Sequence, residues 1–154
     1  MRLFKLLVSF GAALAVVFVV GYIATLLVRA DSAWWLELRK PAFLPGNIIF
    51  QICWMVIYVC LITALTVNIS RRDLHKCLML WGVVLPFNVL WCAVFFVWNL
   101  ALLGLAVLVL QVAALIFITS YYIKNTKELW ISMIPILAWY GFLFVLNYGM
   151  VMMN

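Results

Sequence analysis

The stretch WWLELRKPAFLPGNIIFQICW, Trp34 to Trp54, decides how the chain is interpreted, because it is a polar, proline-containing break between two long apolar runs. One acid, two bases and two prolines fall close together in it: Glu37, Arg39, Lys40, Pro41 and Pro45. Proline cannot donate the hydrogen bond of a helix interior, and it pushes the preceding residue towards an extended conformation. A shaped loop is therefore predicted, and it leads into a helix that Asn47 can cap.

The composition around this stretch is that of a membrane protein. The chain has 154 residues, of which 71% are hydrophobic and 9% are charged. Soluble domains carry about a quarter charged residues. A soluble protein does not need so many apolar residues to form its core, so we expect an integral membrane protein.

Charged residues divide the chain into apolar runs. The runs that follow Lys5, Lys40, Lys76 and Glu128 hold 23, 30, 47 and 26 uncharged residues. A membrane-spanning helix needs about 20 residues, so the run of 47 must fold back on itself. Trp98-Asn99 is the expected turn, with Gly104 as the second choice. Strict apolar–polar alternation is absent, which favours helices over a barrel.

The predicted fold is all-α, a bundle of five transmembrane helices that forms a single membrane domain over residues 1–154. The helices are expected at about 6–28, 47–69, 77–98, 100–123 and 129–152, with a lid loop at about 29–46. A cleaved signal peptide is the alternative interpretation of residues 1–28. The apolar run is long for the hydrophobic region of a signal peptide and no A-x-A site ends it, so we expect a retained helix.

Basic residues predict the orientation. Five spans put seven basic residues on the N-terminal side: Arg2, Lys5, Arg71, Arg72, Lys76, Lys124 and Lys127. The other side has three: Arg29, Arg39 and Lys40. By the positive-inside rule the N-terminus is cytoplasmic and the C-terminus is outside, and we expect a bacterial plasma membrane. The net charge of +6 is then an orientation signal, and no basic face is left for nucleic acid.

Three of the predicted helices carry an aromatic stripe at helical spacing. The stripes are Phe50, Trp54 and Tyr58; Asn88, Trp91 and Phe95; and Pro135, Trp139 and Phe142. Ordinary helix packing explains any one of them. Asn88 adds a polar amide at membrane depth. A polar side chain there either takes part in function or forms an interhelical hydrogen bond. Together the stripes predict an aromatic cavity suited to a flat hydrophobic ligand.

Residues for other chemistry are not visible in the sequence. No paired carboxylates lie in the predicted helices, no Ser/His/Asp set is apparent, and no glycine-rich phosphate loop occurs. The chain has one histidine, and its four cysteines, Cys53, Cys60, Cys77 and Cys92, form no CxxC motif. We therefore expect no metal site, and we expect the cysteines to be small buried hydrophobes.

Three segments resemble the TspO/MBR family, which includes the tryptophan-rich sensory proteins and the translocator protein. The first is Trp34-Trp35-x-x-Leu38-x-Lys40-Pro41-x-Phe43-x-Pro45 with Phe50, Trp54 and Tyr58 behind it. The second is Asn88-x-x-Trp91-x-x-x-Phe95-Phe96. The third is Pro135-x-x-x-Trp139 with Leu146-Asn147 and Asn154. They occur in family order, and the resemblance covers about residues 10–154.

This resemblance implies a five-helix bundle, often a homodimer, with a ligand pocket between the helices beneath the first loop. Family members bind porphyrins, sterols and drug-like aromatic amides. Carried over by position, the ligand-binding residues here are expected to be Trp35, Pro45, Trp54, Asn88, Trp91, Trp139 and Leu143. No cofactor is expected to be required, and the expected partners are a porphyrin or similar flat molecule and membrane lipids.

The chain departs from the family pattern in several places. Pro45-Gly46 replaces a Pro-Pro pair, Trp34-Trp35 replaces Trp-Tyr, and Pro135-Ile136 replaces Pro-Tyr. Leu143-Phe144 stands where a small Ala-Thr pair is usual, which should narrow the pocket. The proposed sterol motif needs Lys or Arg soon after a Tyr, and Tyr148 is followed only by GMVMMN. Sterol binding is therefore not carried over.

Three functions follow as expectations. The first is binding of hydrophobic tetrapyrroles as a sensor, carrier or scavenger. The second is an enzyme, in which light- or oxygen-dependent porphyrin breakdown uses Trp54 and Trp139 as redox-active side chains. We expect binding without catalysis more than an enzyme. The third is a small-molecule transporter or a scaffold, although no internal repeat of the kind common in transporters is found.

Overall fold

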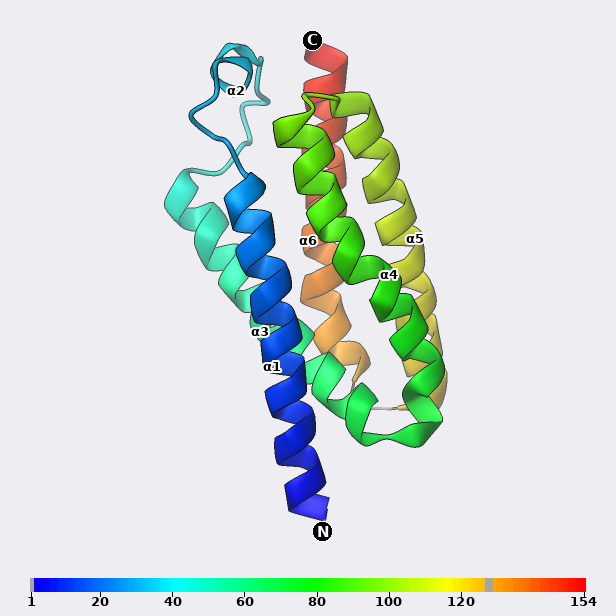
Figure 1. Cartoon of the computed structure of the whole chain (residues 1–154). Coiled ribbons are helices and arrows are strands. Elements are labelled where there is room, and N and C mark those ends of the chain that lie inside the picture. Colours follow the sequence, from blue (N-terminus) through cyan, green and yellow to red (C-terminus); the bar gives the residue numbers. More distant parts are fainter. Residues whose placement is uncertain (1, 127–128) are drawn as a thin grey trace.

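The computed structural model describes residues 2–126 and 129–154, and almost all of them are helical (Figure 1). Five long helices carry the fold: α1 (Arg2–Leu27), α3 (Asn47–Ser70), α4 (His75–Cys92), α5 (Ala101–Asn125) and α6 (Trp130–Met153). Short elements are α2 (Ala33–Glu37), the 3-10 turn η1 (Arg72–Leu74) and the π-helical turn η2 (Ala93–Val97). The all-α fold class is thereby confirmed.

Five segments are long and apolar enough to cross a membrane. They are Leu3–Leu27, Asn47–Ser70, His75–Val97, Ala101–Asn125 and Trp130–Met153. Many large hydrophobic side chains point outwards on these helices; Phe4, Leu102 and Ile48 are each at least 69% exposed. Apolar surfaces of this extent are unfavourable in water and are typical of helices that face lipid. The chain is an integral membrane protein with five candidate spans.

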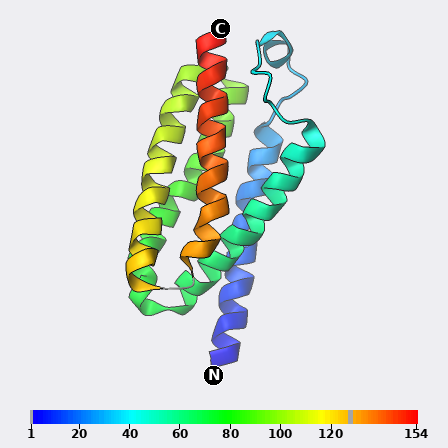
Figure 2. The same cartoon turned by 180° about the vertical axis from the view of Figure 1, so that it is seen from behind.

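The helices pack as a ring whose order differs from the order of the chain. The pairs in contact are α1 with α3, α3 with α6, α6 with α5, α5 with α4, and α4 with α1, and α3 also touches α4 (Figures 1 and 2). The lid loop, the α4–α5 turn and the end of α6 lie together at one end, which we call the lid end. The connection from α3 to α4 lies at the opposite end, the base.

Turns fall close to where the sequence predicts them. The chain reverses between Val97 and Ala101, and Asn99 adopts φ 58°, the only positive φ among the described non-glycine residues. Asparagine tolerates this left-handed conformation better than most residues because its short side chain bonds locally. The alternative turn at Gly104 is wrong, since Gly104 lies inside α5.

A buried set of polar side chains joins three helices at the base. Trp81 of α4 donates from Nε1 to the Tyr122 hydroxyl of α5 at 3.0 Å, and Asn68 of α3 donates to the same hydroxyl. All three side chains are at most 1% exposed. In a membrane, lipid tails are as apolar as leucine side chains, so apolar contact alone does not drive helices together. Interhelical hydrogen bonds of this kind contribute to their association. We call Asn68, Trp81 and Tyr122 the basal node.

An exposed ion pair lies beside this node. Arg71 contacts Asp73 at 2.6 Å, and the Arg71 guanidinium holds the pKa of the Asp73 carboxyl below its usual value. Exposed pairs of this kind contribute little to stability, about 0–1 kcal/mol. Tyr121 donates its hydroxyl to the Asp73 carbonyl at 3.1 Å and fastens the η1 turn to α5.

The cysteines lie within the helices. Cys77 and Cys92 are buried, Cys53 and Cys60 are half-buried, and all four are free thiols. Cys77 is 1% exposed and Cys92 is 3% exposed. Buried free cysteines behave as small hydrophobes. That prediction therefore holds for Cys77 and Cys92 and only in part for the other two.

Candidate functional site

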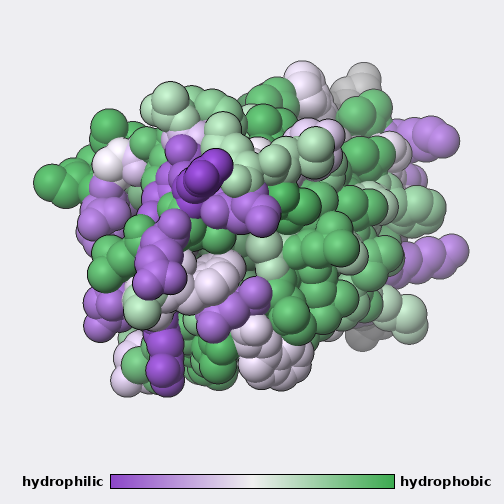
Figure 3. All heavy atoms as spheres, turned by 90° about the horizontal axis from the view of Figure 1, so that it is seen from above, coloured by the Kyte–Doolittle hydropathy of each residue, from purple (hydrophilic) through white to green (hydrophobic). Residues whose placement is uncertain are grey.

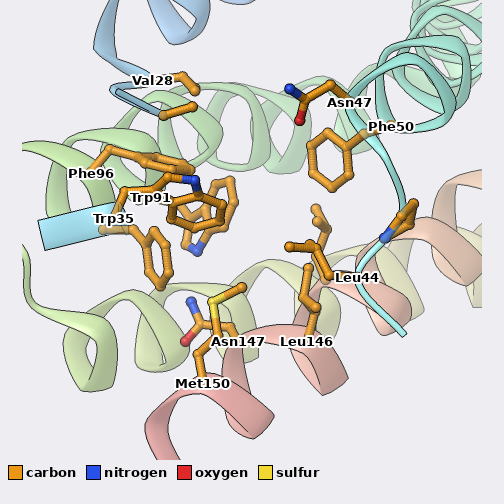
Figure 4. Close-up of a pocket in the computed structure, with 14 residues that line it drawn as sticks. Val28, Trp35, Leu44, Asn47, Phe50, Trp91, Phe96, Leu146, Asn147 and Met150 are labelled. Carbon is orange, nitrogen blue, oxygen red and sulfur yellow. The ribbon is translucent and has the colours of Figure 1, made fainter. Parts of the chain in front are cut away.

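A pocket opens between the lid loop and helices α3, α4 and α6, at the lid end. Its lining includes four aromatic side chains from separate elements: Trp35 of α2, Phe50 of α3, Trp91 of α4 and Phe96 of η2. Figure 4 shows Trp35, Trp91 and Phe96 facing Phe50 and Leu44 across a central space. The remaining lining is mostly apolar, with the amides of Asn47 and Asn147 at its edge. The cavity has a volume of about 100 Å³.

The lid loop has its own local structure. Ser32 caps α2 by accepting a hydrogen bond from the Trp35 amide at 3.2 Å. Lys40 donates to the Leu38 carbonyl at 3.1 Å and to the Trp35 carbonyl, and its ammonium lies 4.8 Å from the Trp35 ring centre. A cation at a helix C-terminus stabilises the unpaired carbonyls there. These contacts orient Trp35 towards the pocket. Figure 3 shows hydrophilic residues gathered on one side of this end of the molecule.

The end of α4 supplies one aromatic wall. Trp91 stacks on Phe95 with ring centres 5.6 Å apart, and Phe95 meets Phe96 edge-on at 5.0 Å. Trp35 contacts both Phe95 and Phe96, at 6.2 and 5.3 Å. The π-helical turn at Ala93–Val97 carries both phenylalanines, and the Trp98 amide bonds five residues back to Ala93 at 3.0 Å. Its wider turn lets consecutive residues share one side, and π turns are frequent at functional sites.

The facing wall is backed by a second aromatic group on α3 and α6. Phe50 lines the pocket and contacts Trp139 at 5.1 Å. Trp54 lies edge-on to Trp139 at 5.7 Å, and Phe142 stacks on Trp139 at 5.4 Å. The aromatic stripes of these two helices therefore lie against one another. Phe50 is the member that reaches the cavity.

The seven predicted ligand-binding residues divide into two groups. Trp35, Pro45, Trp91 and Leu143 line the pocket. Trp54, Asn88 and Trp139 are not part of its lining. The role of all seven in ligand binding stays a prediction.

Asn88 and Trp139 differ in how their polar atoms are satisfied. The Tyr140 hydroxyl of α6 donates to Asn88 Oδ1 at 3.3 Å, so Asn88 forms the interhelical hydrogen bond that the sequence left open as an alternative. Trp139 is 8% exposed, and its Nε1 has no hydrogen-bond partner in the described part of the chain. Buried donors are nearly always paired, so Trp139 Nε1 is an exception, and an acceptor could reach it only if the side chains around it moved.

Asn147 is a site residue that the sequence analysis did not single out. With its amide oriented to satisfy both neighbours, its nitrogen donates to the Ala101 carbonyl at 3.0 Å and its oxygen accepts from Trp91 Nε1 at 3.2 Å. A Cβ on Gly104 would lie 3.3 Å from the Asn147 amide and 3.3 Å from Phe95. Glycine there lets α5 approach both side chains. The Leu146-Asn147 pair of the third motif was the available signal.

Other lining residues were not among the seven predicted. They are Val28, Ala30, Leu44, Asn47, Phe50, Phe95, Phe96, Leu146 and Met150. Of these, Phe50 and Phe95 belong to the aromatic stripes that predicted a cavity. Several belong to the quoted motifs, but ordinary aliphatic residues such as Val28 and Met150 carry no signal in a chain this apolar. No group of three or more His, Cys, Asp or Glu side chains able to hold a metal occurs within residues 2–126 and 129–154.

Comparison with known proteins agrees with these features. Residues 12–153 match the TspO/MBR family. The chain is 21% identical to the tryptophan-rich protein TspO of Chlorobaculum tepidum, covering 97% of this chain and 98% of that protein. It is 26% identical to the tryptophan-rich protein TspO of Archaeoglobus fulgidus, over 100% and 99% of the two chains. Protein CrtK of Rhodobacter capsulatus is 26% identical over 85% and 84%.

The family match covers nearly the whole chain and includes the three motif segments except Asn154. The five-helix architecture and the aromatic residues at the lid end fit the expectation that the motifs raised. The chain belongs to the TspO/MBR family.

Proposed function

We propose that this protein binds a flat hydrophobic tetrapyrrole, a porphyrin or a haem-like molecule, in the pocket at the lid end. The observation that carries the proposal is the lining itself, in which aromatic rings face each other across a narrow space (Figure 4). Apolar sites with a few fixed polar groups are typical of small-molecule pockets. Two polar side chains, Asn47 and Asn147, lie among the described lining residues.

Ring geometry supports a planar ligand. Trp91, Phe95, Phe96 and Trp35 already contact one another edge-on, tilted or stacked, with centres 5.0 to 6.2 Å apart. Such contacts contribute about 0.5–1.5 kcal/mol each beyond burial, and a macrocycle offers a large face for them. The unpaired Trp139 Nε1 lies behind Phe50, and we propose that it gains an acceptor when the pocket rearranges around the ligand.

The lining also argues for binding without acid–base chemistry. The described lining residues contain no Asp, Glu, His, Lys or Cys. General acid–base and nucleophilic mechanisms require such groups within reach of the reacting atom. The role we propose is that of a sensor, carrier or scavenger.

The proposal extends to the protein's setting. Of the described basic residues, Arg2, Lys5, Arg71, Arg72, Lys76 and Lys124 belong to the base end, and Arg29, Arg39 and Lys40 belong to the lid end (Figure 1). By the positive-inside rule we propose that the base end faces the cytoplasm. We propose a bacterial plasma membrane with the lid end outside, and a homodimer in the membrane as the resemblance implies. Epitope accessibility on intact cells tests the orientation.

One observation favours a second candidate, light- or oxygen-dependent breakdown of the bound porphyrin. Trp139 contacts Phe50 of the pocket lining, and the ring centre of Trp54 lies 5.7 Å from that of Trp139. In this candidate, an indole one ring away from the bound porphyrin transfers an electron to or from it, and dioxygen is the oxidant. Porphyrin spectra that stay identical under illumination, with and without the protein, would remove this candidate.

The test of binding is a titration of purified protein with protoporphyrin IX in the dark, followed by tryptophan quenching and porphyrin absorbance. Trp91→Leu and Phe96→Leu remove pocket rings and should weaken saturable one-site binding. Trp98→Leu is the matched control, because Trp98 lies beside the same turn but is 56% exposed and outside the lining. Quenching that never saturates, or that all three variants weaken equally, would reject the proposal.

A further inference from the structure

The end of α6 holds the lid loop through the side chain of Asn154. Asn154 Oδ1 accepts from the Arg39 amide at 2.9 Å, and its Nδ2 donates to the Arg39 carbonyl at 3.0 Å. The same Nδ2 donates to the Met150 carbonyl at 2.8 Å, which fixes the amide against the last turn of α6. The Asn154 side chain thus pairs with both the amide and the carbonyl of Arg39, as the backbone of a neighbouring β-strand would.

A second contact on the same helix holds the lid at close range. A Cβ on Gly149 would lie 2.8 Å from Pro41 Cγ, so only glycine permits this approach. Pro41 is buried by the contact, and Phe43 meets Phe142 edge-on with ring centres 6.3 Å apart. Such packing must shift if any side chain is added at position 149.

The lid must move for a ligand to exchange. The cavity of about 100 Å³ is well below the roughly 300 Å³ at which small-molecule sites begin. Trp35, Leu44 and Pro45 of the lid form part of its wall. Met150, which accepts the Asn154 hydrogen bond, lines the same cavity from α6. Lid contacts and pocket wall therefore share the last turns of one helix.

We propose that Asn154 and Gly149 form a latch that sets how often the lid opens, and therefore how fast a ligand enters and leaves. The latch is a property of the chain without ligand. The proposal depends on the proposed function only for the identity of the ligand that enters and leaves the pocket. Both contacts join segments more than a hundred residues apart in sequence, so releasing them frees the lid without cutting a helix.

The test measures lid opening directly, by hydrogen exchange of the ligand-free protein. The Arg39 amide is excluded, because Asn154→Ala removes its acceptor directly. The readout is the amides of Leu38 and Leu44, whose acceptors, Trp34 and Pro41, lie inside the lid. Asn154→Ala and Gly149→Ala should each raise their exchange about three- to tenfold.

Matched variants separate the latch from general damage. Gly141→Ala changes a glycine of the same helix whose added Cβ meets nothing within 4 Å, and it should leave lid exchange unchanged. Asn154→Asp keeps an acceptor for the Arg39 amide but sets a carboxylate oxygen against the Arg39 and Met150 carbonyls, so it should raise lid exchange at least as much as Asn154→Ala. Unchanged lid exchange in both Asn154→Ala and Gly149→Ala would overturn the proposal.

Ligand exchange is then followed by stopped-flow release of protoporphyrin IX. The latch predicts release about three- to tenfold faster in Asn154→Ala and Gly149→Ala than in Gly141→Ala. Faster lid exchange with unchanged porphyrin release would overturn the gating role. If no variant and no wild-type protein binds porphyrin saturably, the proposed function fails, while altered lid exchange would still support the latch.

Discussion

The base and the lid end of this bundle are held together by different kinds of contact. At the base, Trp81 and Asn68 both donate to the buried Tyr122 hydroxyl, which ties three helices at one point. At the lid end the pocket walls are held by contacts between rings, beside the hydrogen bonds of Asn147 and Asn154, and one indole nitrogen, Trp139 Nε1, has no partner among the described residues. Hydrogen bonds demand fixed geometry, whereas ring contacts allow several arrangements of similar energy.

This difference teaches how one small bundle can be both stable and adaptable. A directional node at the base fixes the register of α3, α4 and α5. Ring packing beneath a latched loop leaves the lid end free to rearrange around a ligand. Regions that bind ligands are commonly drawn from the less stable parts of a fold. The following substitutions test whether the two ends are separable in this way.

The largest effect is expected from Phe95→Ala, which breaks the lid end. Phe95 is 2% exposed and contacts Trp34, Trp35 and Trp91. Truncating a buried phenylalanine costs about 3–5 kcal/mol of unfolding free energy. Chemical unfolding in detergent checks the magnitude, and hydrogen exchange should rise in the lid more than at the base. Phe117→Ala, on a side chain that is 63% exposed, is the control. Equal losses in both variants would contradict the packing argument.

Tyr122→Phe breaks the base instead. It removes the acceptor shared by Trp81 Nε1 and Asn68 Nδ2 and leaves two buried donors with fewer partners. We expect a loss of about 2 kcal/mol. Exchange should rise near the α3–α4 connection while porphyrin affinity of the folded protein stays constant. Tyr148→Phe, on a side chain that is 49% exposed, should be neutral. A change in porphyrin affinity would show that the two ends are not separable.

A smaller effect is expected at the α4–α5 turn of the lid end. Asn99 has φ 58°, where a β-branched residue is strained. Asn99→Val should lower stability by about 1–2 kcal/mol, whereas Asn99→Gly should change it little. The melting temperatures of the two variants test this, and that of Asn99→Val should be the lower one. Equal melting temperatures would mean that the turn relaxes to another conformation.

The smallest stability effect is expected for Trp139→Phe. The smaller ring costs packing, but the substitution also removes a buried donor without a partner, so the net change should stay within about 1 kcal/mol. Porphyrin affinity should nevertheless fall several-fold if Nε1 donates to the ligand. A variant with normal affinity would show that Trp139 only supports Phe50.

Much of the fold could be predicted from the sequence because a bilayer imposes strict lengths. Charges at Lys5, Lys76 and Lys124 bound runs whose lengths allow few solutions, and the predicted turn at Trp98-Asn99 falls between η2 and α5. The short helix α2 inside the lid was not predicted. It depends on a five-residue segment capped by Ser32 and Lys40, too short to show periodicity.

The site was predicted in part, and the misses share one physical origin. Residues such as Trp35 and Trp91 stand in motifs and line the pocket. Phe96 reaches the pocket through a π turn, which shifts helix register by one residue and leaves no pattern in the sequence. Trp54 and Trp139 lie behind Phe50, and helical spacing alone cannot say which member of a stripe reaches the cavity. The contact of Pro41 with Gly149 depends on long-range packing.

The ring order of the helices has a consequence for how the protein is made. α1 and α3 leave the ribosome early and already contact each other, but the ring closes only when α6 packs between α3 and α5. α6 also supplies Leu143, Leu146, Asn147 and Met150 to the pocket and Asn154 to the lid. The lid loop is therefore synthesised long before its anchor. Until α6 inserts, the nascent chain has a lid without its anchor, and the ligand site cannot be completed before that step.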